Sequence, residues 1–209
     1  AGDTKATEDA VAGRAAILWP LRSTRAALMN AGAAAATGDV FFFLHADSLP
    51  PLNALKEIQT VLRDDAVLGG AFAHRFAEAV WSLRFISWLN RRRYFLTRNY
   101  YGDQGIFVRA PTFREMGGYR DLFMEDLDFS RRLKKLGRTK IVPLPLITSG
   151  RRFITWGPWR ALSFILWVLF LHSLRLDTQR YAGYWDAWGG RSLNRRNLTC
   201  SGNQIQRSS

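Results

Sequence analysis

A chain of 209 residues with 47% apolar and 13% aromatic residues is long and apolar enough to bury a sizeable core, which excludes a disordered protein. Its net charge of +13 indicates an anionic partner, such as nucleic acid, an acidic membrane surface or a phosphorylated substrate. The single cysteine, Cys200, excludes an internal disulfide and fits a reducing compartment. Because the first residues are polar and show no signal peptide, we expect a protein of the cytoplasm or of the cytoplasmic membrane face.

The hydrophobic pattern and the turn signals predict alternating strands and helices. Strands are predicted where short apolar runs end at Gly, Pro or polar residues, and helices where apolar residues recur every three or four positions. In chain order the predicted elements are a strand at 15–19, a helix at 25–37, a strand at 40–45, a helix from Pro51 to Leu62, a strand at 67–76, a helix at 79–98, a strand at 106–109, a short helix at 110–116 and a helix that closes at Gly137. This order indicates an α/β domain with a parallel sheet.

The strand predicted at 40–45 organises the rest of the chain. Its apolar run has no polar alternation, which is typical of a strand buried on both faces of a parallel sheet. Ligands bind beyond the carboxyl ends of the strands in such sheets, and Asp47 lies at this end. A lone aspartate here can equally cap the turn into the next helix, so its role depends on motifs further along the chain.

Two segments, at 79–98 and 158–176, combine tryptophan with arginine. In the helix predicted at 79–98, Trp81, Phe85 and Trp88 share one side, and the arginines are expected elsewhere, on a solvated face.

Residues 158–176 are predicted to form an apolar or amphipathic helix. The segment is nearly all apolar from Ala161 to Leu171, has arginines on both flanks, and is well short of the roughly 20 apolar residues that span a bilayer. A helix in the membrane interface fits this pattern, and so does a helix buried against the sheet or against another subunit. Residues 177–209 are expected to be a basic flexible tail.

Several motifs follow one another at spacings that resemble those of family 2 glycosyltransferases. In chain order they are Arg25-x-x-x-x-Asn30-x-Gly32, Gly38-Asp39, His45-Ala46-Asp47, Gly69-Gly70-Ala71-Phe72, the run YGDQGIFVR at 101–109, Gly117-Gly118-Tyr119, Met124-Glu125-Asp126-Leu127-Asp128 and Arg131-Arg132-Leu133. Each motif alone is weakly specific. Their common order is similar to a bacterial branch of the family and covers roughly residues 22–175.

The resemblance implies a GT-A fold over residues 22–157, after a lead-in at 1–21. This fold is a mostly parallel, Rossmann-like sheet flanked by helices. It also implies a nucleotide-sugar donor, inversion at the anomeric carbon and a divalent metal, Mn²⁺ or Mg²⁺. Such cations are commonly held by one or two carboxylates together with phosphate oxygens. Asp47 matches the last carboxylate of the family's metal motif, and His45 stands in place of its first aspartate.

The resemblance also implies roles for other side chains. Asp126 matches the expected general base, which would take a proton from an acceptor hydroxyl, although a carboxylate there also suits the start of a helix. Arginines 151 and 152 could clamp the diphosphate, because guanidinium groups pair with phosphate oxygens. The residues implied in donor binding are Arg25, Asn30, Asp47, Asp103, Gln104, Arg151 and Arg152.

The family's first strands, which supply its nucleotide-base pocket, have no counterpart before residue 22. We therefore expect an N-terminally incomplete domain whose sheet has an unpaired edge.

These observations favour a glycosyltransferase that acts at the cytoplasmic membrane face on a lipid-like or polyprenyl acceptor. A non-catalytic, membrane-associated fragment or relative of the family is the first alternative. A basic nucleic-acid-binding protein is the second. It would explain the charge, but the sequence shows no zinc finger, RNP signature or GXXG loop, so nucleic acid is not an expected partner.

Overall fold

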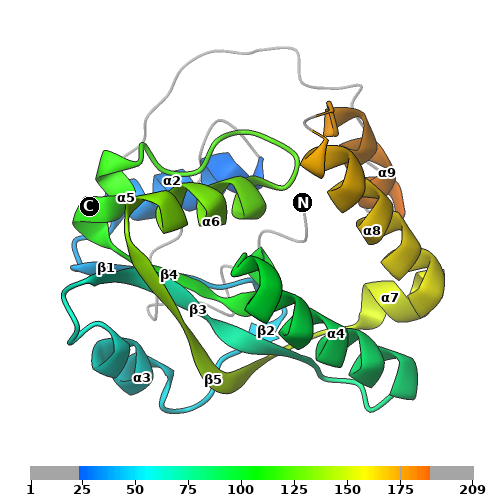
Figure 1. Ribbon diagram of the computed structural model, residues 1–209, viewed down its shortest axis with the longest axis horizontal. Helices are drawn as coiled ribbons and strands as arrows, with labels where there is room; N and C mark the ends of the chain where they lie inside the picture. The colour runs from blue at the N-terminus through cyan, green and yellow to red at the C-terminus, as the bar shows by residue number, and fades with distance from the viewer. Residues whose placement is uncertain (1–23, 175, 189–209) are drawn as a thin grey trace, which may run out of the picture.

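The computed structural model describes residues 24–174 and 176–188 as helices packed around a five-stranded sheet (Figure 1). The elements are α2 (Arg25–Ala35), β1 (Val40–Phe43), β2 (Ser48–Leu49), α3 (Ala54–Val61), β3 (Val67–Phe76), α4 (Trp81–Thr97), η1 (Gly102–Gln104), β4 (Ile106–Arg109), α5 (Ala110–Glu115), α6 (Glu125–Leu136), β5 (Arg138–Thr148), α7 (Arg151–Trp156), α8 (Pro158–Ser173), η2 (Gln179–Tyr181) and α9 (Ala182–Trp188). The predicted strand at 15–19 lies outside the described residues.

The sheet is mixed, with strand order β1-β4-β3-β5-β2. Its longest ladder joins β3 and β5 in parallel, and the other three ladders between described strands are antiparallel. The mixed α/β class agrees with the prediction, but the expected mostly parallel sheet is wrong for this part of the chain. An apolar run indicates burial and not the direction of its partner, so the sequence pattern could not decide this point.

Strand β1 differs from its prediction in burial as well. It pairs with β4 alone among the described strands, so it forms an edge of the sheet. Only Phe41 of its four residues is buried, and Val40, Phe42 and Phe43 are partly exposed. The expected strand with both faces covered is therefore not what the described residues form.

Helices cover both faces of the sheet, and the sheet separates the core between them into two layers (Figure 1). On one face α2, α5 and α6 surround the buried side chains of Tyr100, Phe113 and Phe129. On the other face α3 packs Ile58 into the cluster that contains Phe72. Neighbouring side chains of β3 point to opposite faces, as the two-residue period of a strand requires, and this places Ala71 in one layer and Phe72 in the other.

Two glycines of β3 allow neighbouring strands to approach closely. A Cβ atom on Gly69 would meet the Phe107 carbonyl oxygen of β4. One on Gly70 would meet the Lys140 carbonyl oxygen of β5. Any side chain at either position would therefore push apart the central strands of the sheet.

Strand β5 and helix α7 have no counterpart among the predicted elements. β5 contains Pro143 and Pro145, which cannot donate ladder hydrogen bonds and normally argue against a long strand. The ladder accommodates them with a register shift, in which the partner of Phe72 is Val142 and the partner of Ala73 is Pro145. A bulge of this kind cannot be read from the sequence of one strand.

The structure describes the C-terminal part as far as residue 188, except for residue 175. Helix α8 lies within the predicted segment at 158–176, whereas η2 and α9 fall inside the segment 177–209 that was expected to be a flexible tail. Residues 189–209 of that tail lie outside the described residues.

Candidate functional site

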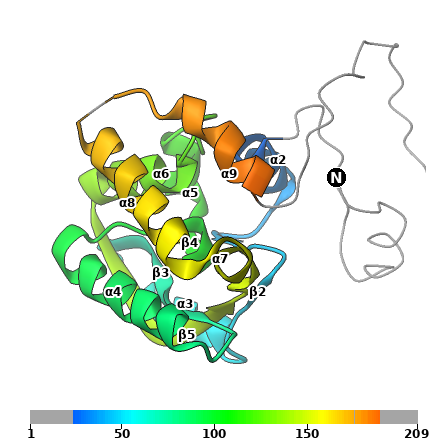
Figure 2. The same ribbon diagram turned by 90° about the vertical axis from the view of Figure 1, so that its right-hand side faces the viewer.

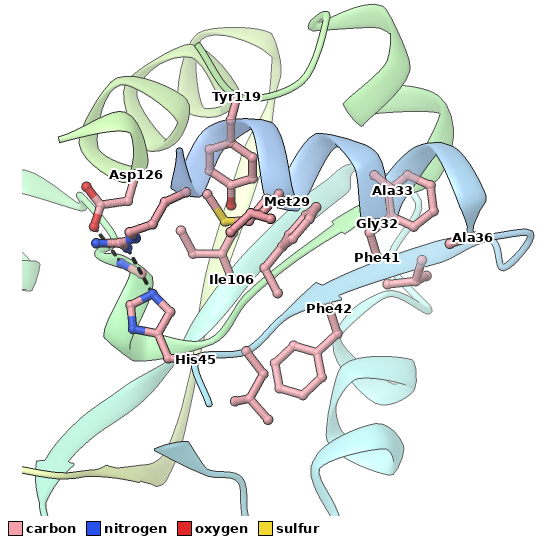
Figure 3. Close-up of a pocket in the computed structure, with 16 residues that line it drawn as sticks. Met29, Gly32, Ala33, Ala36, Phe41, Phe42, His45, Ile106, Tyr119 and Asp126 are labelled. Carbon is pink, nitrogen blue, oxygen red and sulfur yellow. Dashed lines mark hydrogen bonds between the residues drawn. The ribbon is translucent and has the colours of Figure 1, made fainter. Parts of the chain in front are cut away.

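Four elements converge where β1 ends: the start of α2, the residues after β1, η1 and the start of α6 (Figure 3). They line one end of a pocket of about 430 Å³ with Arg25, His45, Gly102 and Asp126. Gly102 allows this convergence, since a Cβ atom on it would lie 2.6 Å from His45 Nε2 and 2.7 Å from Arg25 Nη2.

The rest of the pocket wall is apolar and is supplied mainly by α2 and β1, including Leu28, Met29 and Phe42. This wall follows the edge of β1 that has no partner among the described strands. A strand that paired with this edge would cover it.

Asp126 is held at the first turn of α6, with its carboxylate towards the pocket (Figure 3). Its Oδ2 accepts a hydrogen bond of 2.7 Å from the Gly102 amide, and its Oδ1 accepts one of 2.7 Å from the Leu127 amide. Met124, which precedes the helix, has a left-handed φ of 65°, uncommon for a residue with a side chain. The carboxylate therefore has a fixed position and a favourable place at the positive end of the helix dipole.

Arg25 connects two side chains of the site. Thr24 caps α2 by accepting from the Ala27 amide at 3.3 Å, which makes Arg25 the first residue of the helix. The Arg25 Nε atom lies 3.0 Å from Glu125 Oε1, and its Nη2 atom donates to His45 Nε2 at 2.9 Å. One guanidinium thus links the loop after β1 to the start of α6.

Glu125 is a member of this cluster to which the sequence motifs assigned no separate role. Burial raises the pKa of its carboxyl group, the neighbouring Asp126 raises it further, and Arg25 acts in the opposite direction. The sequence feature that could have identified Glu125 was its place beside Asp126 in the Met-Glu-Asp motif. Removing the Arg25 guanidinium would leave a buried carboxyl without its cation.

His45 is neutral in this environment. Burial lowers the pKa of the imidazole, the positive charge of Arg25 lowers it further, and the nearby aspartates only partly compensate. Because Nε2 accepts from Arg25, the single ring proton of the neutral form belongs on Nδ1. In this arrangement neither ring nitrogen offers a lone pair to a cation.

We expect the free energy of unfolding to decrease as the pH falls below about 6.5, in part because of His45. The unfolded chain, with an ordinary histidine pKa of 6.5, takes up this proton at a higher pH than the folded chain. The stabilisation is therefore fully present above 6.5 and is lost as the pH falls towards the lower folded pKa. Denaturant unfolding between pH of about 7.5 and 5.5 measures the slope. The His45→Asn variant should show a smaller slope but not zero, since burial also lowers the pKa of His172. An unchanged slope would contradict the assignment.

The two predicted metal ligands, Asp47 and His45, lie in different environments. Asp47 is exposed on the loop after β1, and its backbone carbonyl accepts from the Ser149 amide at 3.3 Å. No three His, Cys, Asp or Glu side chains gather into a metal-binding group within residues 24–174 and 176–188. Asp47 fits a site in which one carboxylate shares a hard cation with phosphate oxygens, whereas the Nε2 atom of His45 is engaged by Arg25.

Two side chains predicted to bind the nucleotide-sugar donor, those of Asn30 and Gln104, form hydrogen bonds to backbone groups of the protein instead. The Asn30 amide donates to the Tyr119 carbonyl at 2.8 Å and accepts from the Tyr119 amide at 2.9 Å, which ties α2 to the turn after α5. Gln104 is buried; its side chain accepts from the Tyr101 amide at 2.9 Å and donates to the Phe72 carbonyl at 3.2 Å. Both side chains position the site, because their polar groups face backbone partners.

The remaining residues predicted to contact the donor, Asp103, Arg151 and Arg152, do not line the pocket. Asp103 belongs to η1, and its Oδ2 lies 3.4 Å from Nε2 of the buried His74, a neighbour that the motifs did not indicate. Arg151 and Arg152 begin α7 and do not line this pocket. The Arg152 guanidinium lies over the Trp185 ring, 4.6 Å from its centroid.

Part of the chain matches a known protein family. The family model described as glycosyl transferase family 2 matches residues 17–119, a range that holds β1 to β4 with Arg25, His45 and Asp47 and ends before α6. No curated protein matches the chain. The mixed α/β architecture is consistent with a GT-A-like domain, and the family match supports the identification of this chain as a family 2 glycosyltransferase.

Proposed function

We propose that this protein transfers a sugar, with inversion, from a nucleotide-sugar donor to a hydroxyl or carboxyl group of a lipid-like or polyprenyl acceptor at the cytoplasmic face of a membrane. The observation that carries the proposal is the Asp126 carboxylate, held by the Gly102 amide at the polar end of the pocket, in a chain whose residues 17–119 match the family. A fixed carboxylate at a cavity is the arrangement that a general base requires.

The proposed reaction is a single displacement at the anomeric carbon of the donor sugar. Asp126 takes the proton of an acceptor hydroxyl while the acceptor oxygen bonds to the anomeric carbon. The bond from that carbon to the donor's phosphate oxygen breaks, and the nucleoside diphosphate leaves with the electron pair. Attack opposite the leaving group inverts the configuration. Arg25, which lines the same end of the pocket, would place a guanidinium near the departing anion.

A divalent cation, Mn²⁺ or Mg²⁺, would neutralise the diphosphate in the proposed reaction, and Asp47 is the carboxylate that would hold it. The exposed position of Asp47 leaves room for the phosphates and waters that complete such a site. A lipid-like acceptor and a membrane location are supported by the exposed apolar side chains of α8, among them Leu166 and Phe170.

Asp47→Asn should abolish metal-dependent binding of the donor's nucleotide while the domain stays folded. The change keeps the size of the side chain and removes its charge. Calorimetry with a panel of nucleoside diphosphates, with Mn²⁺ and then with a chelator, should find at least one that binds the unmodified protein only with metal. The matched control is Asp65→Asn, an exposed aspartate outside the pocket, which should bind normally. The proposal fails if no nucleoside diphosphate binds, or if Asp47→Asn retains the same Mn²⁺ dependence.

A further inference from the structure

The first half of helix α4, residues 81–88, exposes its large aromatic side chains and buries its small polar ones. Trp81 and Trp88 are 69% and 50% exposed, and Phe85 between them is also exposed. The buried side contains Leu83 and Ile86 together with two serines, of which Ser87 accepts a hydrogen bond from the β3 backbone. A helix that served only to cover the sheet would have the opposite distribution.

The arginines of α4 share the exposed side with these aromatic rings. Arg84, Arg91 and Arg92 are exposed at helical spacing from Trp81 and Trp88. The expected separation of an aromatic side from a solvated arginine side is therefore wrong. Arg92 lies over the Trp88 ring, 5.3 Å from its centroid, so charge and aromatic surface are in direct contact.

Helix α8 continues this surface. Its buried residues are Ala161, Val168 and Leu171, and its exposed large side chains are Trp159, Leu166, Trp167, Phe170 and, just beyond its end, Leu174. Trp159 joins the two helices, since its ring lies 5.5 Å from that of Trp81 and 5.9 Å from that of Phe85. Figure 2 shows α8 beside α4. We call the exposed sides of α4 and α8 together the aromatic surface.

The aromatic surface carries positive charge and no acid. The sequences of α4 and α8 contain no Asp or Glu, and Arg160 adds a further exposed cation beside Trp159. The carboxylate of Glu78, just before α4, is engaged by the Gly150 amide and the Ser149 hydroxyl. No acidic side chain of α4 or α8 neutralises these arginines. A partner with complementary charge is therefore anionic.

We propose that the aromatic surface docks on an anionic lipid bilayer, with α4 and α8 lying together in the interface. Tryptophan is favoured at the boundary between headgroups and hydrocarbon, and arginine beside it reaches the lipid phosphates. A second copy of the chain would bring the same positive charge to the contact, in a protein of net charge +13. Among the described helices none is long and apolar enough to cross a membrane, so contact along the helix sides is the mode that fits.

The inference rests on the membrane part of the proposed function and adds α4 as a second docking element. Membrane docking can be tested without measuring enzymatic turnover. The docking proposal can therefore fail while sugar transfer is found, and sugar transfer can be absent while docking is found.

The experiment is sedimentation of the full chain with vesicles. The unmodified protein should bind vesicles that contain phosphatidylglycerol, bind pure phosphatidylcholine weakly, and be partly released by salt. A triple variant, Trp81→Gln, Phe85→Ser and Trp88→Gln, should bind the anionic vesicles at least about tenfold less. A variant with Leu166→Ser and Phe170→Ser should also bind less, since both helices contribute.

The matched control replaces exposed apolar residues elsewhere: Leu52→Ser and Leu55→Ser, beside and in α3, should leave binding unchanged. A second variant, Arg84→Gln with Arg91→Gln, should weaken binding to anionic vesicles alone. Melting curves check folding, which exposed substitutions should preserve.

Two results would overturn the proposal. One is binding of the α4 triple variant to anionic vesicles as tightly as the unmodified protein. The other is an absence of vesicle binding together with a dimer that the triple variant dissociates, which would assign the surface to a second copy of the chain.

Discussion

Asp126→Asn is expected to lower the rate of sugar transfer by about 10²-fold or more while the protein stays folded and still binds donor. Asparagine keeps one oxygen that can accept from the Gly102 amide, which Asp126 now contacts at 2.7 Å, and loses the second acceptor that the Leu127 amide now uses. It cannot take up the proton that the attacking hydroxyl must lose. The contact with the Gly102 amide can therefore be kept in the variant, whereas the proton acceptor is removed.

A purely structural role for Asp126 predicts a different result. The loss of a helix cap costs about 1 kcal/mol and should leave turnover largely intact at a permissive temperature. Transfer rate and melting temperature are therefore measured together. The matched control is Asp128→Asn in the same helical turn, where the carboxylate pairs with Arg132 at 2.8 Å instead of facing the pocket. A folded, donor-binding Asp126→Asn protein with near-normal transfer would rule out the general base.

Gly70→Ala should destabilise the protein by about 2 kcal/mol or more, because the sheet has no room for the added methyl group. The new Cβ atom would meet the Lys140 carbonyl of β5 on the side of the longest ladder, and the Phe107 ring stands 2.9 Å away. The Lys140 carbonyl belongs to the backbone of a central strand, so it cannot move without separating the ladder. Thermal or urea unfolding measures the loss.

Gly32→Ala provides the opposite case. Gly32 lies inside α2, and a Cβ atom on it would have no neighbour within 4 Å. Alanine there should raise stability by about 0.5–1 kcal/mol, since it has the higher helix propensity and restricts the unfolded chain. If the two alanine variants proved equally stable, the close approach between β3 and β5 would be contradicted.

Elements whose signals are local were predictable. The last helix before β5 has acidic residues at its start, an apolar stripe through Phe129 and Leu133, and Gly137 at its end, and α6 has these bounds within a few residues. A Gly-Gly pair inside a strand is typical of a bend or a close backbone approach, and Gly69 and Gly70 of β3 make the close approach. In each case one stretch of sequence contains the whole physical cause.

Features that depend on a partner were not predictable. The direction of β1 follows from its pairing with β4, far along the chain. The acceptance of Pro145 in β5 follows from a bulge against β3. The exposed side of α4 could not be read from the spacing of Trp81, Phe85 and Trp88, because the same spacing fits a buried stripe equally well.

The candidate site divides in the same way. The motifs indicated Arg25, Asp47 and Asp126, and the structure places Arg25 and Asp126 at one pocket, with Asp47 nearby on the loop after β1. Asn30 belongs to the same motif as Arg25 but faces the backbone of Tyr119. Residue type and spacing show that a polar group is present, and only the fold shows which partner it meets.

The strand order also affects how fast the sheet can assemble. Ser48 of β2 meets Thr148 of β5 across 100 residues of chain, and the central β3–β5 ladder joins segments separated by α4, η1, β4, α5 and α6. Loops of this length must close before their ladders contribute any stability, which places folding in the slow, millisecond-to-second range. During synthesis, β3 waits without its parallel partner until residues 138–148 have left the ribosome, and this interval is the period in which its apolar faces stay open to other chains.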